Sequence, residues 1–340
     1  MKKLCQIGIV GASGLVGTEL IQQLRQRNFP VKSLSLFAGF EDAGGEAEHS
    51  EEPLTIEPIR ADYYQGLDLV FFAAHPMVSR DLAEDAGKAG VWVIDASRAF
   101  RLDPEVPLMV PEVNPESLKK IKAGKKIIAS PGPTAVALSL ALSALENKAG
   151  IKQAVALALY PSSYAGRQGL EEHQEQTLAI FNQQEFEMAK FPRQIAFNIF
   201  PQVRGFLGKS TEEEKDIEEE LKKILARPDL KIGLTCAQAP VFAGISIFLD
   251  LETEKPIKEP ALRDLLCRSP GIQVIDQPDQ EQYPDLLASM EQDQVLAGRI
   301  REVPGSGNRF QLWINIDNSR KGSALNLVQI AEKMMELELI

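Results

Sequence analysis

The chain has 340 residues, and at ~150 residues per domain this length predicts two domains, each large enough for a buried core. Hydrophobic residues make up 44% of the chain and charged residues 25%, which excludes a disordered chain, a fibrous repeat and a disulfide scaffold. Acidic residues outnumber lysine and arginine by 48 to 37, and the net charge of −11 argues against nucleic acid or an anionic membrane surface as a partner.

The N-terminal part of the chain alternates between apolar runs and helical patterns. Strands are predicted at residues 4–10, 33–38, 69–74 and 91–95, with helices at 18–27 and around Leu82, Ala83 and Ala86. Strands separated by helical patterns indicate a parallel, doubly wound sheet. Residues 41–52 are acidic and contain glycine, and they are predicted to form a solvated loop.

A second unit begins near Ser130. Helices are predicted at residues 134–146, 169–181 and 211–225, and strands at 153–160, 232–237, 244–252, 294–300 and 310–316. Runs of strands without helices between them indicate an antiparallel or mixed sheet, so this domain is predicted to be α+β. A last amphipathic helix, 323–336, has Leu327, Ile330 and Met334 at core spacing.

A glycine-rich turn, GASGLVG, lies between the first predicted strand and the first predicted helix. Its G-x-x-G-x-x-G pattern permits positive φ angles and leaves room for the backbone to approach a pyrophosphate. The following helix N-terminus offers unpaired N–H groups and the positive end of a dipole. A tight strand-to-helix turn without a ligand is the alternative. The residues expected to bind a dinucleotide here are Gly11, Ser13, Gly14, Leu15, Val16 and Gly17.

The second strand should lead to the residue that contacts the adenosine ribose. Its exit, LFAGFEDAGG, contains no arginine or lysine for a 2′-phosphate, and Glu41 and Asp42 would repel one. An acid at Glu41 suits a ribose 2′-hydroxyl, so NAD is favoured over NADP as the cofactor. The alternative is that Glu41 and Asp42 simply lie in an exposed loop.

Cysteine usage and the N-terminus bear on localisation. Cys5, Cys236 and Cys267 are odd in number and far apart, which favours a reducing compartment. No apolar run approaches the ~20 residues of a membrane span. The start MKKLCQIGIV is similar to a signal peptide, but it leads into the glycine turn without a cleavage-type segment. We expect a cytoplasmic protein with no membrane partner.

Several motifs in order make the chain resemble the aspartate-semialdehyde dehydrogenase family from end to end. They are GASGLVG, IDASRAFRLDPEVPLMVPEVNP at 94–115, FPRQIAFNIFPQV at 191–203, APVFAG at 239–244, GRIRE at 298–302 and DNSRKGSALNLVQIAE at 317–332. The resemblance implies a Rossmann-type dinucleotide domain of residues 1–129 plus 318–340 and an α+β dimerisation domain of residues 130–317. It also implies a homodimer, a cofactor contact from Asn318, and NADPH-dependent reduction of aspartyl phosphate in amino-acid biosynthesis.

The reaction of this family requires a cysteine nucleophile, since a thiolate attacks the acyl phosphate and forms a thioester. The family segment resembles A-N-P-N-C-x-T, whereas this chain has ASPGPTAV, with Pro133 at the cysteine position. Proline suits the first turn of a helix but has no nucleophile. Cys5 and Cys236 lie in predicted strands, where cysteines are usually inert.

The other catalytic positions differ as well. The family pattern resembles R-V-P-V-x-x-G-H-S, and QAPVFAGIS in this chain has Ile245 at the acid–base histidine and Gln238 at the substrate-binding arginine. Asp216 stands at a lysine position, Tyr160 at a glutamine and Gly132 at an asparagine. Loss of a nucleophile or its base commonly costs about 10⁶-fold in rate. No catalytic residue is therefore predicted.

Three positions of the family's anion and substrate site are retained. Arg101 matches the phosphate-binding arginine, Asn114 lies in the retained VPEVN segment, and Glu213 matches the carboxylate that binds the substrate amine. Alternatively, Arg101 pairs with Asp103 or Glu105, and Glu213 is one of a run of exposed acids.

The resulting prediction is a non-catalytic homodimer, similar to the Usg-like paralogues of the family, that retains NAD or NADP binding, with NAD favoured and no metal. His173 does not complete an H-E-x-x-H zinc motif, since Gln174 follows it. One alternative is a different NAD-dependent dehydrogenase or reductase with Tyr160 or Tyr164 as the acid. The other is an active aspartate-semialdehyde dehydrogenase.

Overall fold

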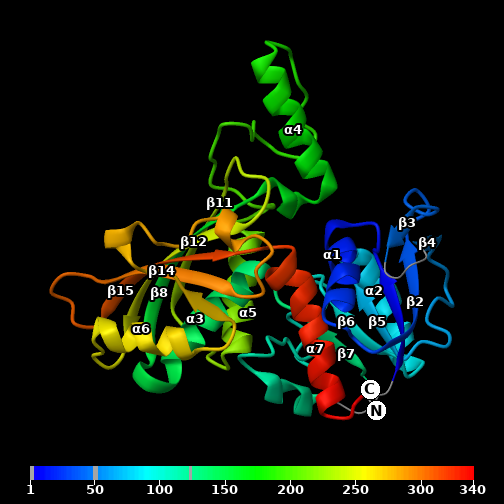
Figure 1. The fold of residues 1–340 in the computed structure, drawn as a ribbon, viewed down its shortest axis with the longest axis horizontal. Helices are drawn as coiled ribbons and strands as arrows, with labels where there is room; N and C mark the ends of the chain where they lie inside the picture. Colours follow the sequence, from blue (N-terminus) through cyan, green and yellow to red (C-terminus); the bar gives the residue numbers. More distant parts are fainter. Residues whose placement is uncertain (1–3, 49–52, 122–124) are drawn as a thin grey trace. The chain divides into compact units, whose positions relative to one another are not determined.

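The computed structural model describes residues 4–48, 53–121 and 125–340. The chain forms two compact units, one of residues 1–132 and 323–340 and the other of residues 133–322. Residues 130–132 thus belong to the first unit and residues 318–322 to the second, opposite to the expected boundaries. Each unit has its own sheet (Figure 1).

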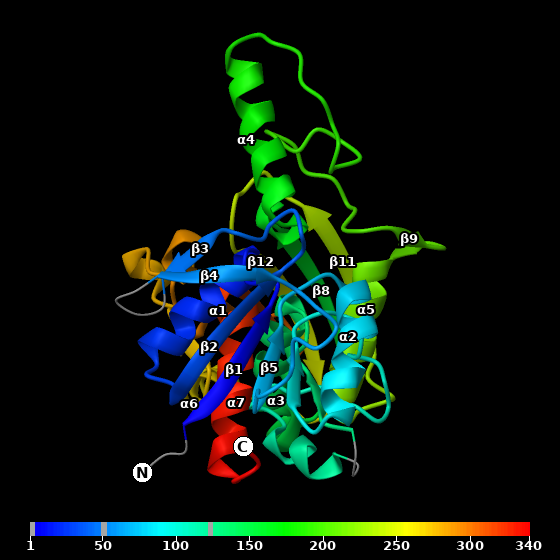
Figure 2. The same cartoon turned by 90° about the vertical axis from the view of Figure 1, so that its right-hand side faces the viewer.

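The first unit is built on a seven-stranded sheet in the order β3-β4-β2-β1-β5-β6-β7, and every pairing is parallel except β3 with β4. Figure 2 shows β2, β1 and β5 side by side. This sheet confirms the predicted doubly wound α/β fold. The strands are β1 Cys5–Val10, β2 Val31–Ala38, β3 Glu46–Glu48, β4 Pro53–Pro58, β5 Leu69–Phe72, β6 Trp92–Asp95 and β7 Ile127–Ala129.

The predicted solvated loop at residues 41–52 is only partly correct. Glu46–Glu48 forms β3 and pairs antiparallel with β4, while residues 49–52 lie outside the described part of the chain. The strand was missed because its sequence, EAE, has neither β-branched nor aromatic residues; backbone pairing with β4 holds it instead. The six-residue strand β4 and the three-residue strand β7 were also not predicted.

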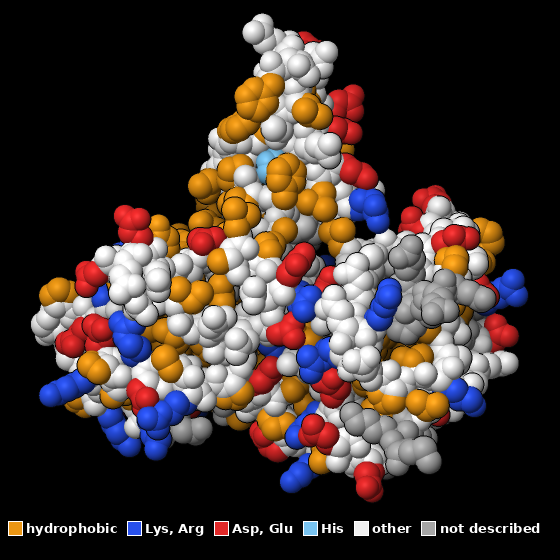
Figure 3. Space-filling view, viewed as in Figure 1, with side chains coloured by type: hydrophobic (Ala, Val, Ile, Leu, Met, Phe, Trp, Pro, Cys, Tyr) orange, Lys and Arg blue, Asp and Glu red, His pale blue; other side chains and the backbone are white. Residues whose placement is uncertain are grey.

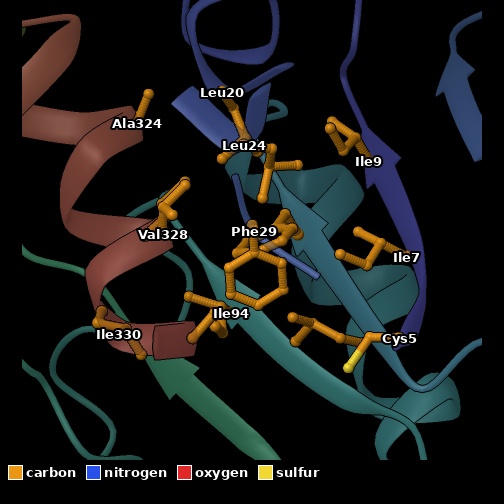
Figure 4. Packing of buried hydrophobic residues seen from close by; sticks show 14 of the residues in the cluster. Cys5, Ile7, Ile9, Leu20, Leu24, Phe29, Ile94, Ala324, Val328 and Ile330 are labelled. Atoms are coloured by element: carbon orange, nitrogen blue, oxygen red, sulfur yellow. The ribbon is translucent and has the colours of Figure 1, made fainter. Parts of the chain in front are cut away.

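Helices cover the first sheet. On one face, α1 (Leu15–Gln26) and α7 (Leu325–Glu336) pack with β1 and β6 (Figure 4). Cys5, Ile7 and Ile9 of β1 are fully buried there, as a parallel strand requires. Contacts with β5, β6 and β7 are made by α2 (Pro76–Lys88), and a 3₁₀ turn at Pro115–Lys120 precedes β7.

The second unit has a mixed six-stranded sheet in the order β11-β8-β12-β15-β14-β13. The central strands pair antiparallel, and β11 and β13 join the edges in parallel. This arrangement confirms the predicted α+β class. The strands are β8 Ile151–Tyr160, β11 Ile232–Gln238, β12 Ile245–Thr253, β13 Ile272–Val274, β14 Val295–Glu302 and β15 Arg309–Ile316.

Three helices, α3 (Pro133–Ala149), α5 (Glu212–Ile224) and α6 (Glu259–Arg268), pack on this second sheet. A small hairpin, β9 (Phe206–Leu207) with β10 (Ser210–Thr211), leads into α5, and Thr211 caps it with Glu214 in a capping box. Short 3₁₀ turns lie at Pro278–Gln280 and Leu287–Ser289, and a π turn at Arg320–Ala324 precedes α7.

The helix α4 (Arg167–Phe181) projects from the second unit as an arm (Figure 1). Two buried polar side chains hold the chain that returns along it. Glu172 accepts hydrogen bonds from the N–H groups of Ala189, Lys190 and Phe191. Gln176 likewise accepts from Ile195 and Ala196. Because this returning segment has no strand or helix, these carboxylate and amide groups satisfy its backbone.

Candidate functional site

The glycine turn lies where the order of the strands in the parallel sheet reverses. β1 has β2 on one side and β5 on the other, so the turn after β1 lies at a switch point, the place where open α/β sheets bind ligands. Gly11 has φ +87°, and a Cβ there would collide with the carbonyl oxygen of Ala73. A Cβ on Gly17 would collide with the carbonyl oxygen of Gly11. Both positions therefore require glycine.

The N-terminus of α1 begins at this turn. Gly14 is its N-cap residue and contributes no capping side chain, and Leu15 and Val16 form the first turn. Ser13 lies in the turn itself. The first N–H groups of a helix have no partner within the helix, so this end is suited to an anion such as a pyrophosphate. These residues lie together as predicted; their role in cofactor binding remains a prediction.

Glu41 and Asp42 follow β2 and are both exposed. The N–H of Asp42 donates to the carbonyl of Gly39 (3.1 Å), which closes a four-residue turn with Glu41 at its tip. The N–H groups of Gly11 and Ala12 both donate to the carbonyl of Phe37 (2.8 and 3.1 Å), so the exit of β2 adjoins the glycine turn. Glu41 thus lies on a turn next to the switch point, as a ribose-binding acid would.

The loop after β6 contains a buried carboxylate that the sequence analysis did not single out. Asp95 accepts hydrogen bonds from the hydroxyls of Ser79 (2.9 Å) and Ser97 (2.8 Å) and from the Ser97 N–H. Burial raises the pKa of Asp95, although these hydrogen bonds and the charge of Arg101 act to lower it. The signal in the sequence that would have identified it is a carboxylate at the end of an apolar strand with a serine two residues later.

Arg101 and Asn114 lie in the same unit as Asp95. Arg101 donates to the carbonyl of Ala96 (2.6 Å), while Lys125 pairs with Asp103 (2.7 Å) and lies 3.6 Å from Glu105. The amide of Asn114 is buried; it accepts from the N–H of Val110 and donates to the carbonyl of Leu108 (both 2.9 Å). Asn114 thus stabilises its own loop, and an anion-binding role for either residue remains a prediction.

In the second unit, a cluster of polar side chains surrounds Tyr160 at the end of β8. The Tyr160 ring is fully buried; its hydroxyl donates to Glu213 Oε1 (2.8 Å) and lies 2.6 Å from the hydroxyl of Thr134. Tyr164 donates to Glu213 Oε2 (2.8 Å). Burial, followed by the charge of Glu213, raises the pKa of Tyr160 well above its ordinary value. Tyr160 is therefore a permanent hydrogen-bond donor at physiological pH.

Glu213 has 3% of its surface exposed, so the alternative that it is one of several exposed acids is wrong. Its counter-ion is Arg204, which the sequence analysis missed. Arg204 lies 3.1 Å from Glu213, 2.5 Å from Glu212 and 2.6 Å from Asp216. Burial alone would lower the pKa of Arg204, but the hydrogen bond to Asp216 and the nearby carboxylate charges outweigh it and raise the pKa. Glu213, which the sequence predicts to bind a substrate amine, is thus already paired with a cation of this chain.

The three cysteines offer no activated thiol at this cluster. Cys5 and Cys236 are buried, as predicted, and Cys267 is exposed on α6. Cys236 lies near Tyr160 and Glu213, where burial and then the charges of Glu213 and Glu214 raise its pKa. A raised pKa disfavours the thiolate, the form that acts as a nucleophile.

Pro133 and Ile245, which stand at the predicted nucleophile and acid–base positions, are both buried. Pro133 is the first residue of α3 and is buried; a Cβ on Gly322 would lie 2.5 Å from its Cβ. Ile245 is fully buried at the start of β12. Gln238 is buried too, and its amide donates to the carbonyl of Tyr160 (3.0 Å). None of these side chains can carry a proton or an acyl group.

Asn318 and His173 both hold loops of the second unit. Asn318 accepts from the N–H of Gly244 (2.8 Å) and contacts the hydroxyl of Ser163 (3.2 Å); its contact with a cofactor stays a prediction. His173 is buried, lies 3.1 Å from the Ser162 hydroxyl and stacks on Phe242. Among the residues that the structure describes, no three histidine, cysteine or acidic side chains are grouped as a metal site would need.

Comparison with known proteins agrees with this architecture. Residues 6–121 match the model of the semialdehyde dehydrogenase NAD-binding domain, and residues 142–321 match that of the semialdehyde dehydrogenase dimerisation domain. The chain is also 38% identical to the aspartate-semialdehyde dehydrogenase of Aquifex aeolicus, over 98% of this chain and 99% of that one. The chain belongs to the aspartate-semialdehyde dehydrogenase family.

Another relative and a solved structure are similar to the chain over nearly its whole length. The chain is 36% identical to a USG-1 protein homolog of Azotobacter vinelandii, over 99% of both chains. The structure of aspartate semialdehyde dehydrogenase II of Vibrio cholerae, complexed with ASA, has a TM-score of 0.94 at 32% identity, over 98% of this chain and 99% of that one. Family membership thus confirms the resemblance and the predicted fold, with an NAD(P)-binding domain and a dimerisation domain. In the described residues no helix meets the length and hydropathy of a membrane span.

Proposed function

We propose that this chain is a non-catalytic, homodimeric member of the aspartate-semialdehyde dehydrogenase family that retains a nucleotide site. One observation carries the proposal: within the described part of the chain, the cluster around Tyr160 contains neither a reactive thiol nor an imidazole. Glu213 accepts hydrogen bonds from Tyr160, Tyr164 and Arg204, all of this chain. Proline and isoleucine at positions 133 and 245 can neither attack an acyl phosphate nor transfer a proton.

The nucleotide of the proposal is NAD rather than NADP. Support comes from Glu41 on the turn after β2, since a carboxylate accepts hydrogen bonds from ribose hydroxyls and repels a 2′-phosphate. No lysine or arginine lies between Leu36 and Gly45 to offset that repulsion. Calorimetric titration with NAD and NADP tests this: Glu41→Ala should narrow the preference for NAD, and tighter binding of NADP to the unaltered protein would contradict the proposal.

The dimer is proposed to use the open face of the second unit. Val155 and Leu157 of β8 are 53% and 37% exposed, and other exposed hydrophobic residues continue along the arm that carries α4 (Figure 3). Exposed apolar side chains of this kind are typical of protein interfaces. The exposed apolar residues of the arm and its returning chain are Leu178, Phe181, Met188, Phe197 and Ile199. Sedimentation at micromolar concentration should therefore give a dimer.

An active oxidoreductase of amino-acid biosynthesis is the second candidate, and the names of the relatives favour it. The decisive assay is NADP- and NAD-linked oxidation of aspartate semialdehyde in the presence of phosphate. The proposal predicts no turnover above the uncatalysed rate. Turnover near that of an ordinary family enzyme would refute it. If a substrate screen revealed another oxidoreductase activity, Tyr160→Phe and Tyr164→Phe would test whether either tyrosine is the acid.

A further inference from the structure

The two ends of the arm that carries α4, residues 166–199, meet at one carboxylate of the second unit. The chain enters the arm through a 3₁₀ turn at Ser162–Ala165, directly before α4 (Figure 1). It leaves the arm through an irregular segment at residues 200–205. Tyr164 lies in the entry turn and Arg204 in the exit segment, and both side chains reach Glu213 in the first turn of α5. Two ends that are far apart in the sequence therefore share one anchor.

The two ends share a single oxygen atom of this anchor. The hydroxyl of Tyr164 donates to Oε2 of Glu213 (2.8 Å), and the guanidinium of Arg204 donates to the same Oε2 (3.1 Å). The other oxygen, Oε1, accepts from Tyr160 at the end of β8 (2.8 Å). Glu213 is 3% exposed, so water has little access to replace either donor. Hydrogen bonds to a charged acceptor are stronger than those between neutral groups, so each end of the arm is firmly held.

Four backbone N–H groups beside the anchor report on how firmly each end is held. At the entry they belong to Ser162 and Ser163, which donate to the loop after β11 (2.9 and 3.0 Å). At the exit they belong to Phe200 and Gln238, which donate to each other's carbonyls (3.2 and 2.9 Å). These bonds join backbone groups, so each one breaks only when the chain at that end moves. Their exchange with solvent measures the two ends separately.

We propose that Glu213 acts as a clasp, a single carboxylate that holds the entry and the exit of the arm together and so presents the arm's apolar surface to a second copy of the chain. The carboxylate accepts from three donors of its own chain. This positioning role accounts for a carboxylate that is retained where the nucleophile and acid–base positions are not. The link to a second copy rests on the proposed dimer, whereas the clasp itself does not.

Hydrogen–deuterium exchange of the full chain, resolved to these four amides, tests the clasp. Tyr164→Phe removes one donor and should speed exchange at the entry amides about tenfold, in line with the loss of a hydrogen bond to a charged group, with the exit amides unchanged. Arg204→Met should speed exchange at the exit amides and leave the entry amides unchanged. Glu213→Met removes the acceptor and should speed exchange at both ends. General destabilisation would not produce a change confined to the end that lost its donor.

Asp276→Asn is the matched control. Asp276 is a buried carboxylate of the same unit, and its partners, Arg263 (2.5 Å) and the backbone of β14, belong to neither end of the arm. This variant should leave the four amides unchanged. The N–H groups of Ala189 and Ile195, which are bonded within the arm, should keep their protection in every variant. Unchanged exchange in both single-donor variants would overturn the proposal, as would the same increase in Asp276→Asn.

Sedimentation separates the clasp from the dimer. Glu213→Met should weaken self-association about tenfold or more, because a loosened arm loses more entropy when it becomes ordered at an interface. Unchanged self-association, despite faster exchange at both ends, would overturn the link between the clasp and the second copy. If Glu213→Met does not fold, the two single-donor variants carry both measurements. A monomeric unaltered protein would refute the proposed dimer, and the exchange pattern would still decide whether Glu213 is a clasp.

Discussion

The ion pair between Arg204 and Glu213 gives the sharpest test of how the second unit is stabilised. Replacement Arg204→Met removes the guanidinium and keeps an unbranched side chain of similar packing. Glu213 is 3% exposed, so its charge loses a counter-ion without access to water. Breaking a buried pair costs about 3–5 kcal/mol, whereas exposed pairs contribute at most about 1 kcal/mol.

The surroundings of Glu213 moderate this cost. Tyr160 and Tyr164 still donate to its carboxylate, at 2.8 Å each, and the Arg204 side chain is 22% exposed. Glu212 and Asp216, at 31% and 24% exposure, are solvated in part and add little. We therefore expect Arg204→Met to lower the free energy of unfolding by about 2–3 kcal/mol, below the value for a fully buried pair.

Urea denaturation at matched protein concentration measures the effect; guanidinium chloride is avoided because its cation resembles the group removed. Arg268→Met is the control, since Arg268 is 77% exposed and pairs with the half-exposed Asp264, and its cost should stay below about 1 kcal/mol. Adding Glu213→Gln to Arg204→Met should cost less than the sum of both single variants. A loss for Arg204→Met no larger than for Arg268→Met would refute the reasoning.

Three further predictions follow from the described contacts. Gly17→Ala forces a Cβ into the carbonyl oxygen of Gly11, so this variant should lose NAD binding and melt at a lower temperature. Gly39→Ala is the control: it has open space around it and should lower the melting temperature less. Thiol titration should give one fast cysteine, abolished by Cys267→Ser, with Cys5 and Cys236 reacting only on unfolding; a fast Cys236 would contradict the buried, high-pKa thiol. Burial lowers the pKa of His173, so the unfolded chain takes up its proton first and stability is lost as pH falls below about 6.5; in pH-dependent melting, His173→Gln should flatten this loss, and an unchanged pH profile of that variant would contradict the reasoning.

The sequence alone was sufficient for the fold class and for the position of the glycine turn. Apolar strands with helices between them predict a parallel sheet because buried strands and amphipathic helices leave strong local patterns. The steric need for glycine at Gly11 and Gly17 is local as well, so its spacing is readable without coordinates. Weak patterns failed: β3 consists of EAE, which has no β-branched or aromatic residue, and its backbone pairs with β4.

The polar cluster of the second unit depended on the tertiary structure. The identity of Pro133 and Ile245 is a property of the sequence, but nothing in the sequence indicates that Arg204 is the counter-ion of Glu213. Tyr160 and Glu213 are 53 positions apart in the sequence. Arg204 lies in an irregular segment and itself has a φ of +66°. Side-chain pairing over such separations depends on how the chain brings β8, α5 and this segment together. Local sequence patterns do not predict such long-range contacts. Sequence thus determined which chemical groups are present, and folding decided which of them neutralise one another.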